Sequence, residues 1–336
     1  MPDMSPELVR VDSRKCAEVA AVLARHTIPA ATEGHANVVG LPASALPNFY
    51  LLAVAICHQT SPVGQVRLGG TLTTGETAWG WDYLRRRLAE RARENLSILD
   101  PACWQRLTPR ELAELLAAED GPVHLTDPER RAALIRDAGT RMSINGWSGA
   151  EAIHAEEGGW LLRDNRGILV RLGEFAAYRD PVRKKSNYLL ELLRNECRWH
   201  YRDPQNLGVP VDYHEVRGHL RLGTVRVIDP DLETRLKARA PVDHKADVAI
   251  RTAVARAIDE IAAAVGSTDS PTLHYLFWNV FRSCCGRDST HCWACGPECV
   301  LPRRYRLGTA ECLLAPACAS RGAPVLVEHQ HETDFY

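Results

Sequence analysis

The chain has 336 residues, of which 45% are hydrophobic and 25% charged, and its formal net charge is -1. A chain of this length can bury one large or two small cores, and its composition excludes a disordered, collagen-like or coiled-coil protein. The near-zero charge argues against a protein held on nucleic acid by bulk electrostatics. No run reaches ~18 consecutive apolar residues, so we expect no transmembrane helix and no membrane partner.

Helical patterns dominate the chain. Residues 108–111 read Thr-Pro-Arg-Glu, a capping box with proline in the first helical turn. Further helices are expected from 127, from 184, along the apolar stripe at 250–265, and from 270. Only 224–228 and 325–327 are typical of strands, and the Gly- and Thr-rich stretch 64–80 predicts a loop or hairpin. The patterns together predict a mainly α protein without internal repeats.

Cysteine is the unusual residue of this chain. There are 11 cysteines, and seven of them lie between residues 284 and 318. The N-terminus mixes acids and bases without an apolar stretch, so we expect no secretory signal and a cytoplasmic protein. Disulfides are rare in that compartment, so a clustered set predicts metal ligands. The candidate ligands are Cys285, Cys292, Cys295, Cys299, Cys312 and Cys318.

Asp212 is the first candidate catalytic residue. It follows Pro210 in the segment Val-Asp-Tyr-His-Glu-Val-Arg of 211–217, at a predicted helix start. Proline favours extended geometry in the residue before it, and an aspartate at a helix start can cap backbone N–H groups. Helix capping is therefore the structural interpretation of Asp212. The functional interpretation depends on two further segments of the chain.

Those two segments are 180–190, Asp-Pro-Val-Arg-Lys-Lys-Ser-Asn-Tyr-Leu-Leu, and 51–60, which ends in Cys-His-Gln-Thr. With 211–217 they resemble the helix-hairpin-helix DNA glycosylase superfamily. The resemblance implies a two-lobed helical fold, a catalytic role for Asp212, and Lys184 at the position of the Schiff-base lysine of bifunctional members. The hairpin glycines of that family are absent, and Val182 stands where one is expected. Such glycines let backbone N–H groups approach a DNA phosphate, so their absence argues against duplex binding through the hairpin.

A more distant resemblance, over roughly 50–280 and the tail, is to the queuosine salvage proteins, which are nucleoside or nucleotide N-glycosylases. It is carried by Lys184-Lys185, Asp212-Tyr213, the segment 247–251, Phe277-Trp278-Asn279 and the terminal Tyr336. Asn279 replaces an acid of that pattern and Ala249 a glutamate. With the first resemblance, it implies that the substrate-binding residues are His58, Lys185, Tyr213, His214, Trp278 and Tyr336.

An aspartate suits cleavage of an N-glycosidic bond. Positive charge builds on the sugar as the bond breaks, and a carboxylate near C1′ stabilises that charge and can orient or deprotonate the attacking water. A nearby lysine could form an imine with C1′ or hold a phosphate. The structural alternative for Lys184 and Lys185 is a solvated first helical turn.

The cysteine spacing admits two metals. The start, Cys285-x6-Cys292-x2-Cys295, resembles the iron–sulfur loop of the endonuclease III branch, but Leu301 stands where the fourth ligand is expected. The pair Cys312-x5-Cys318 resembles the closing of that loop, which implies a [4Fe–4S] cluster in an enlarged loop. The alternatives are zinc on Cys292, Cys295 and two further ligands, for which His291, Cys312 and Cys318 are available, or free thiols.

Three functions follow as hypotheses. The first is an N-glycosylase acting on a modified nucleoside or nucleotide, for example a 7-deazapurine one. The second is a DNA base-excision glycosylase or AP lyase that uses Lys184 and Asp212 with an iron–sulfur cluster. The third is a non-enzymatic, metal-stabilised module that binds a nucleoside or nucleic acid. For each we expect one helical lobe over 45–180 and another over 1–44 and 181–336, which carries the cysteine-rich module 284–318.

Overall fold

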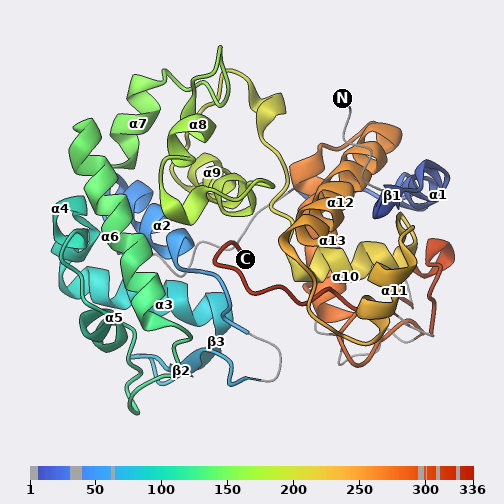
Figure 1. The fold of residues 1–336 in the computed structure, drawn as a ribbon, viewed down its shortest axis with the longest axis horizontal. Coiled ribbons are helices and arrows are strands. Elements are labelled where there is room, and N and C mark those ends of the chain that lie inside the picture. The colour runs from blue at the N-terminus through green and yellow to red at the C-terminus, as the bar shows by residue number, and fades with distance from the viewer. Residues whose placement is uncertain are drawn as a thin grey trace. The chain divides into compact units, whose positions relative to one another are not determined.

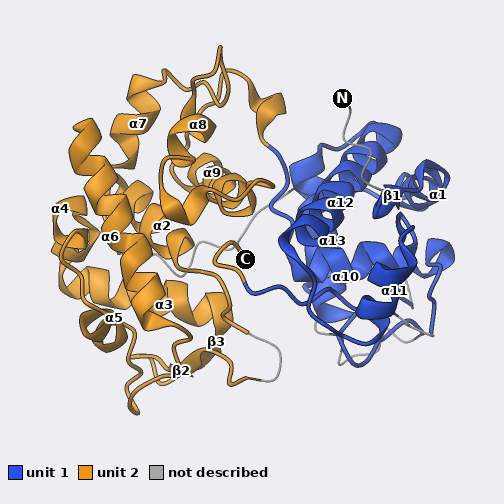
Figure 2. Cartoon of the chain, viewed as in Figure 1, with its two compact units in different colours: residues 1–31, 208–332 blue, residues 32–207, 333–336 orange. Residues whose placement is uncertain are grey.

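The computed structural model describes residues 7–30, 40–61, 65–293, 299, 301–307, 311–322 and 326–336. These residues form thirteen α-helices and four short strands, which confirms the mainly α prediction (Figure 1). None of the described helices combines the length and apolarity needed to span a bilayer. The chain divides into two compact units, residues 1–31 with 208–332 (unit 1) and residues 32–207 with 333–336 (unit 2) (Figure 2).

Unit 2 is a helical bundle with one small hairpin. Its helices are α2 (Leu46–Ala55), α3 (Gly80–Glu94), α4 (Pro101–Trp104), α5 (Pro109–Leu115), α6 (Pro128–Asn145), α7 (Ala150–Glu156), α8 (Ile168–Leu172) and α9 (Lys184–Glu196). Helix α2 is almost entirely buried and packs against α3, α6, α7 and α9. A helix that is apolar on all sides has to lie inside a core. The strands β2 (Gly69–Thr71) and β3 (Thr77–Trp79) pair antiparallel, which confirms a hairpin within 64–80.

Unit 1 is built around the long helix α12 (His244–Val265). Helices α1 (Ser13–Leu23), α10 (Tyr213–Leu222) and α13 (Ser270–Ser283) pack on it. The strands β1 (Val9–Val11) and β4 (Val225–Val227) pair antiparallel, and α11 (Pro230–Lys237) follows β4. The strand expected at 224–228 is thus present as β4. Of the one expected at 325–327, residue 325 lies outside the described residues, and Leu326 and Val327 form no strand.

The unit boundaries differ from the expected lobes at three places, the first being that unit 2 begins at residue 32 and not at residue 45. Helix α9 belongs to unit 2, because its apolar face, including Leu189 and Leu193, is buried in the same core as α2. The last four residues, 333–336, also belong to unit 2, although the segment before them belongs to unit 1. Unit 2 therefore contains Lys184, Lys185 and the C-terminus, and unit 1 contains Asp212.

The close approach of α10 to α13 depends on Gly218. A Cβ atom at this position would lie 2.2 Å from atoms of the Phe281 ring, a distance that no real side chain could adopt. The Phe281 ring also stacks on Phe277, one turn earlier in α13, at 5.5 Å between ring centroids. This packing brings the beginning of α10 beside α13, and the candidate catalytic aspartate lies at that beginning.

Candidate functional site

Asp212 is the N-cap of α10 and is half-buried. Its Oδ1 accepts hydrogen bonds from the backbone N–H groups of His214 at 2.7 Å and Glu215 at 3.4 Å. Its Oδ2 accepts from the indole Nε1–H of Trp278 at 2.9 Å. Donors on both oxygens fix the orientation of the carboxylate. Asp212 is therefore a helix cap, as the local sequence predicted, and in addition is held by a side chain of α13.

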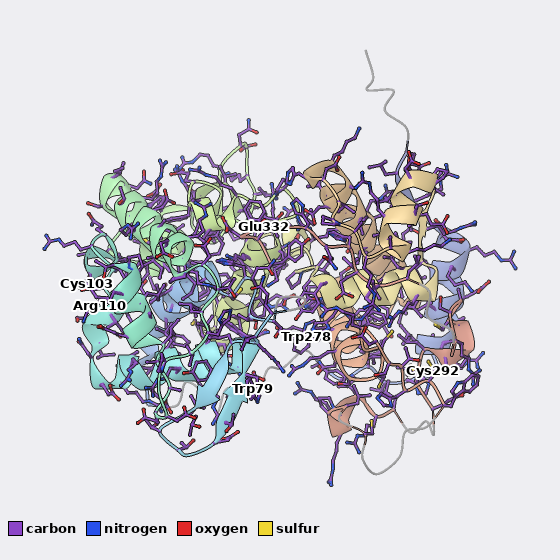
Figure 3. All side chains as sticks on the ribbon, turned by 60° about the horizontal axis from the view of Figure 1, so that its bottom comes forward. Trp79, Cys103, Arg110, Trp278, Cys292 and Glu332 are labelled. Carbon is purple, nitrogen blue, oxygen red and sulfur yellow. The ribbon has the colours of Figure 1, made fainter. Side chains whose placement is uncertain are left out.

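Aromatic rings and arginines surround this carboxylate within unit 1. The rings of Tyr213 and His214 lie 4.2 Å apart, and Trp278 lies edge-on to His214 at 6.1 Å. Trp278 is labelled in Figure 3. All three side chains are half-buried. The Arg282 guanidinium lies 4.8 Å from the Trp278 ring, and that of Arg287 lies 5.8 Å from the Tyr213 ring. Half-buried aromatic faces beside fixed cations can stack on a base and attract an anionic group.

His214 is neutral at physiological pH. Burial lowers the pKa of its imidazole to about 4; Asp212 acts in the opposite direction, and Arg217 lowers it further. The Nη2 of Arg217 lies 2.8 Å from Nδ1 of His214. A guanidinium only donates, so Nδ1 accepts and the imidazole proton must be on Nε2. His214 therefore presents one N–H donor and no charge.

Arg217, the last residue of the 211–217 segment, connects His214 to two other parts of unit 1. Besides His214 it donates to Glu328 Oε2 at 2.8 Å and to the backbone oxygen of Cys285 at 2.7 Å. Burial alone would raise the pKa of Glu328, but Arg217 and Arg287 together lower it. Both partners of the Arg217–Glu328 ion pair are almost fully buried. No pattern pointed to Glu328, because its partner lies 111 residues away in the sequence.

Replacing Arg217 by methionine should destabilise the protein by about 3–5 kcal/mol, since it leaves part of the charge of a buried carboxylate without its partner. Urea denaturation measures this as a lower free energy of unfolding. The double variant Arg217→Met with Glu328→Gln should recover part of the loss. Arg226→Met removes an exposed arginine of the same unit and should change the stability by less than about 1 kcal/mol. Equal effects of the two arginine variants would contradict the buried-pair interpretation.

A second network, around the capping glutamate, supports Asp212. Glu215 accepts from the backbone N–H of Asp212 at 3.2 Å and so completes a capping box. Its other oxygen pairs with His274 of α13. Burial raises the pKa of Glu215, and His274 acts in the opposite direction. This pair gives a second link between α10 and α13 beside the Asp212–Trp278 hydrogen bond.

The predicted residues of unit 2 form a separate group at the start of α9. Lys184 is half-buried, and its Nζ lies 3.7 Å from Cys57 Sγ and 5.3 Å from the Tyr188 ring. Lys185 is fully buried and donates to the Ala55 backbone oxygen at 2.5 Å. The two adjacent lysines therefore have different environments, and only Lys184 retains access to solvent. The prediction of a solvated first turn is wrong for Lys185.

Lys185 and His58 interact with each other. The Lys185 Nζ lies 3.3 Å from His58 Nδ1. Burial lowers the pKa of Lys185 to about 7, with a further contribution from Lys184. Burial also holds the pKa of His58 well below its ordinary value, and Lys185 adds to that effect. At neutral pH this part of unit 2 thus contains a neutral imidazole and an amine that titrates near physiological pH.

The lowered pKa of the buried Lys185 amine predicts that the stability of the protein depends on pH. Between about pH 7 and pH 10.5 Lys185 is neutral in the folded protein and protonated in the unfolded chain. The unfolded state then binds more protons, so the free energy of unfolding rises with pH by up to ~1.4 kcal/mol per pH unit. In Lys185→Met this rise should be absent, whereas Lys245→Met, at an exposed position, should keep it. Urea denaturation at several pH values between 6 and 10 provides the measurement, and parallel curves for wild type and Lys185→Met would contradict the prediction.

The turn before α9 uses its own backbone donors. The Asp180 carboxylate accepts from the N–H groups of Val182 at 3.1 Å and Lys184 at 2.9 Å. Arg183, between them, has φ +59°, the left-handed region that glycine adopts without strain. The N–H groups that a glycine hairpin would offer to a phosphate are thus turned toward a carboxylate. The signal in the sequence is an aspartate two and four residues before the donors, typical of an Asx turn.

The C-terminal residues pack on unit 2. The backbone oxygen of Tyr336 accepts from the Gln59 N–H at 3.3 Å, and the Tyr336 side chain is buried. Asp334 accepts from Arg130 Nε at 2.5 Å and lies 3.9 Å from His58 Nε2. The tail is therefore ordered through specific contacts at the end of α2. Arg130 and Asp334 had no signal in the sequence, since they are 204 residues apart.

The predicted site residues thus form two groups, one in each unit. Asp212, Tyr213, His214 and Trp278 gather at the start of α10 in unit 1. In unit 2 the group comprises His58, Lys184, Lys185 and Tyr336.

The predicted metal ligands lie in unit 1, except that Cys295 is outside the described residues. Burial raises the pKa of the Cys312 thiol to about 12, and Cys292, Cys285 and Cys318 each raise it further. The Cys312 N–H also donates to the Cys292 backbone oxygen at 3.3 Å. Cys299 is half-buried.

Arg221 of α10 connects the cysteines to the rest of unit 1. Its buried guanidinium donates to Cys285 Sγ at 3.2 Å and to the Gly286 and Leu326 backbone oxygens, both at 2.7 Å. The Cys318 Sγ donates to the Arg221 backbone oxygen at 3.6 Å. A cation that donates to sulfur stabilises a thiolate, the form that binds metals. Among the described residues, however, no three cysteine sulfurs lie within 4.8 Å of one another.

Comparison with known proteins gives no assignment: no protein-family model matches the chain, and neither does any curated protein.

Proposed function

We propose that the protein is an N-glycosylase that hydrolyses the N-glycosidic bond of a modified nucleoside or nucleotide, with a 7-deazapurine base as the first to test. One observation carries the proposal. A half-buried carboxylate, Asp212, is held by three N–H donors beside the half-buried rings of Tyr213, His214 and Trp278.

In this reaction the bond between C1′ and the base nitrogen breaks, and its electron pair leaves with the base. Asp212 stabilises the positive charge that develops on the sugar, as a fixed anion does best in a site shielded from water. A water molecule then adds to C1′ and passes a proton to the Asp212 carboxylate or to solvent, while the departing base nitrogen takes up a proton from solvent to give the free base. The Nε2–H of neutral His214 is suited to hydrogen-bond an acceptor on the base, and the rings of Tyr213 and Trp278 to stack on it.

The turn of residues 180–184, before α9, is our reason for proposing a small substrate and not duplex DNA. Its N–H groups donate to Asp180, and a carboxylate at that position repels a phosphate. The formal net charge of -1 gives no general attraction to a polyanion either. Lys184, the half-buried amine that follows this turn, remains suited to bind a single phosphate or to form an imine.

DNA base excision is the second candidate, and arginines near the cysteines favour it. Arg282, Arg287, Arg303, Arg304 and Arg306 are all in 282–306, where basic side chains could contact a DNA backbone. That function would use Lys184 as the nucleophile of a lyase step. Its imine with C1′ would be trapped by borohydride on DNA with a damaged base, and the trapping would disappear in Lys184→Ala.

For the cysteine module we propose a [4Fe–4S] cluster, with zinc as the alternative. Sulfurs that share one zinc lie ~3.8 Å apart, given Zn–S bonds of ~2.3 Å. Those of a [4Fe–4S] cluster each bind a different iron and stand farther apart. The proposal of the cluster rests on the spacing Cys285-x6-Cys292-x2-Cys295 and on Cys312-x5-Cys318. The metal would stabilise unit 1 and take no part in bond cleavage.

A base-release screen tests the function. Protein purified without oxygen is incubated with modified nucleosides, their 5′-monophosphates and lesion-containing duplexes, and free base is measured by chromatography. We expect release from nucleosides or nucleotides and none from duplex DNA. Release from DNA alone would support the second candidate. Binding of a nucleoside without turnover, across the whole panel, would support a non-enzymatic module and overturn the proposal.

A further inference from the structure

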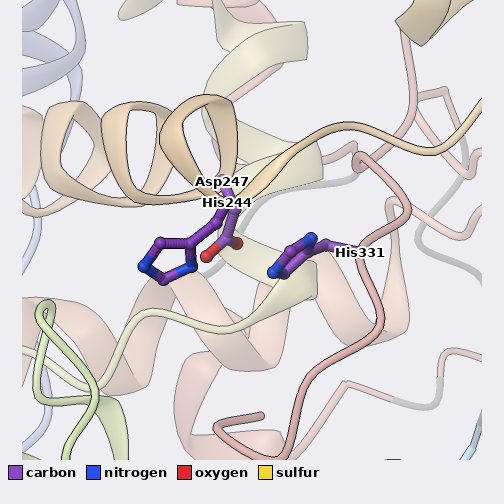
Figure 4. Close-up of side chains that lie close together, drawn as sticks. All are labelled: His244, Asp247 and His331. Carbon is purple, nitrogen blue, oxygen red and sulfur yellow. The ribbon is translucent and has the colours of Figure 1, made fainter.

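Three potential metal ligands lie together in unit 1, at the start of α12 and in the C-terminal segment. His244 and Asp247 come from the first turn of α12, and His331 from the C-terminal segment (Figure 4). One potential ligand atom from each of the three lies within 4.8 Å of the other two. We propose that these three residues bind a divalent transition-metal ion.

The backbone brings the three ligands together. His244 and Asp247 are three residues apart on a helix and therefore share a face. The C-terminal segment is fixed beside them, because the Val242 N–H donates to the Gln330 backbone oxygen at 2.9 Å and Pro241 forms a parallel bridge with Gln330. His331 is the next residue, so its position relative to His244 is set by main-chain pairing.

The hydrogen bond that His331 makes through Nδ1 leaves its Nε2 available to bind a metal ion. Its Nδ1 lies 3.2 Å from the Val242 backbone oxygen. A carbonyl oxygen only accepts, so Nδ1 carries the proton and Nε2 carries the lone pair. Donation of the second ring nitrogen to a backbone carbonyl is typical of metal-binding histidines. His244 is exposed and makes no hydrogen bond among the described residues, so its ring can turn toward an ion.

Asp247 supplies an oriented carboxylate. It is fully buried, and it accepts from Arg251 at 2.8 and 3.0 Å and from His329 Nε2 at 2.8 Å. Such partners orient a ligand carboxylate, and Arg251 also balances part of its charge. We therefore expect moderate, exchangeable binding.

The ligand set defines the class of ion. Two imidazoles and one carboxylate suit Zn²⁺, Co²⁺, Ni²⁺ and Fe²⁺, and are poor ligands for Ca²⁺. Three protein ligands, one of them exposed, leave coordination positions open to water or to a small anion. The site would also link the start of α12 to the C-terminal segment just before that segment continues into residues 333–336.

A Co²⁺ titration of the purified protein tests the site, with binding followed by calorimetry and visible absorption. The variants are His244→Ala and His331→Ala, and the control is His124→Ala, an exposed histidine of unit 2. The cysteine module is the same in all four proteins, so differences in binding report the histidine site. Wild type and control should bind one more Co²⁺ than either variant at the same metal concentration, or bind it at least ~10-fold more tightly.

The melting temperature gives an independent readout. Co²⁺ should raise it in wild type and in the control by mass action, and should raise it less in both variants. Without metal the variants should melt close to wild type, since His244 is exposed; if His331→Ala fails to fold, His244→Ala alone decides the outcome. Equal stoichiometry and affinity in all the folded proteins would overturn the proposal.

Discussion

Asp212→Asn should slow base release ~10²–10³-fold, the loss expected when one preorganised electrostatic group of an active site is removed. Asparagine has the same shape, and its oxygen can still accept from the His214 and Glu215 N–H groups, so the helix cap survives, although its NH2 group cannot accept from Trp278. The neutral amide cannot stabilise a cationic sugar, however. The fall should therefore appear in kcat/KM on the nucleoside or nucleotide that the screen identifies, with little change in melting temperature.

The matched control is Asp229→Asn. Asp229 is the N-cap of α11 in the same unit and accepts from the Leu232 N–H at 2.7 Å. It carries the same charge and the same capping role, without the aromatic surroundings. We expect wild-type activity for this variant. If Asp212→Asn releases base at the wild-type rate, Asp212 is a cap and nothing more; if both variants lose activity equally, the loss arises from helix capping.

The starts of several helices were predictable because their signals are local. The capping box Thr108–Glu111 begins α5 as expected. Asp212 is the N-cap that its position after Pro210 indicated, and the helices expected from 184 and 270 begin at those residues. Each signal depends on a few neighbouring residues, whose side chains satisfy the first N–H groups of the helix.

The groups of residues that meet across long stretches of sequence were not predictable. Glu328, His331 and Asp334 lie within seven residues of one another, in a tail whose composition alone indicates disorder. Each nevertheless has partners far back in the chain: Arg217 for the first, Val242 for the second, Arg130 for the third. These pairings follow from the packing of each unit, which has no periodic signal in the sequence.

The different environments of Lys184 and Lys185 were not predictable either, because they also depend on the packing of the unit. Lys184 was assigned a catalytic role and Lys185 a substrate-binding role from their place in a motif, and the motif does not distinguish their environments. Lys185 is directed into the core of unit 2, where it meets Ala55 and His58, and Lys184 remains half-buried beside Cys57. Which of two adjacent helical residues is buried depends on the face that packs on α2, and the boundary of unit 2 was not expected to include α9.

Cys312→Ala should release the metal and unfold unit 1. A structural metal site contributes on the order of 10 kcal/mol in small metal-dependent domains, which is comparable to the whole stability of most domains. Removing a buried thiol that holds no metal would instead cost only ~1–2 kcal/mol, as for the loss of a small core side chain. The size of the effect therefore distinguishes a ligand from a core residue.

Cys103→Ala is the control, because Cys103 is exposed in unit 2. It should keep both metal content and stability. Elemental analysis of the purified proteins, together with their visible spectra, identifies the bound metal as iron or zinc. Urea denaturation of the same proteins gives their free energy of unfolding. Since Cys285, Cys292, Cys312 and Cys318 are all proposed ligands of the same metal, replacing any one of these four by alanine should have the same consequence. A loss of ~1–2 kcal/mol with unchanged metal content in all four variants would show that the ligands are other residues, and a chain free of metal from the start would reduce the module to packed thiols.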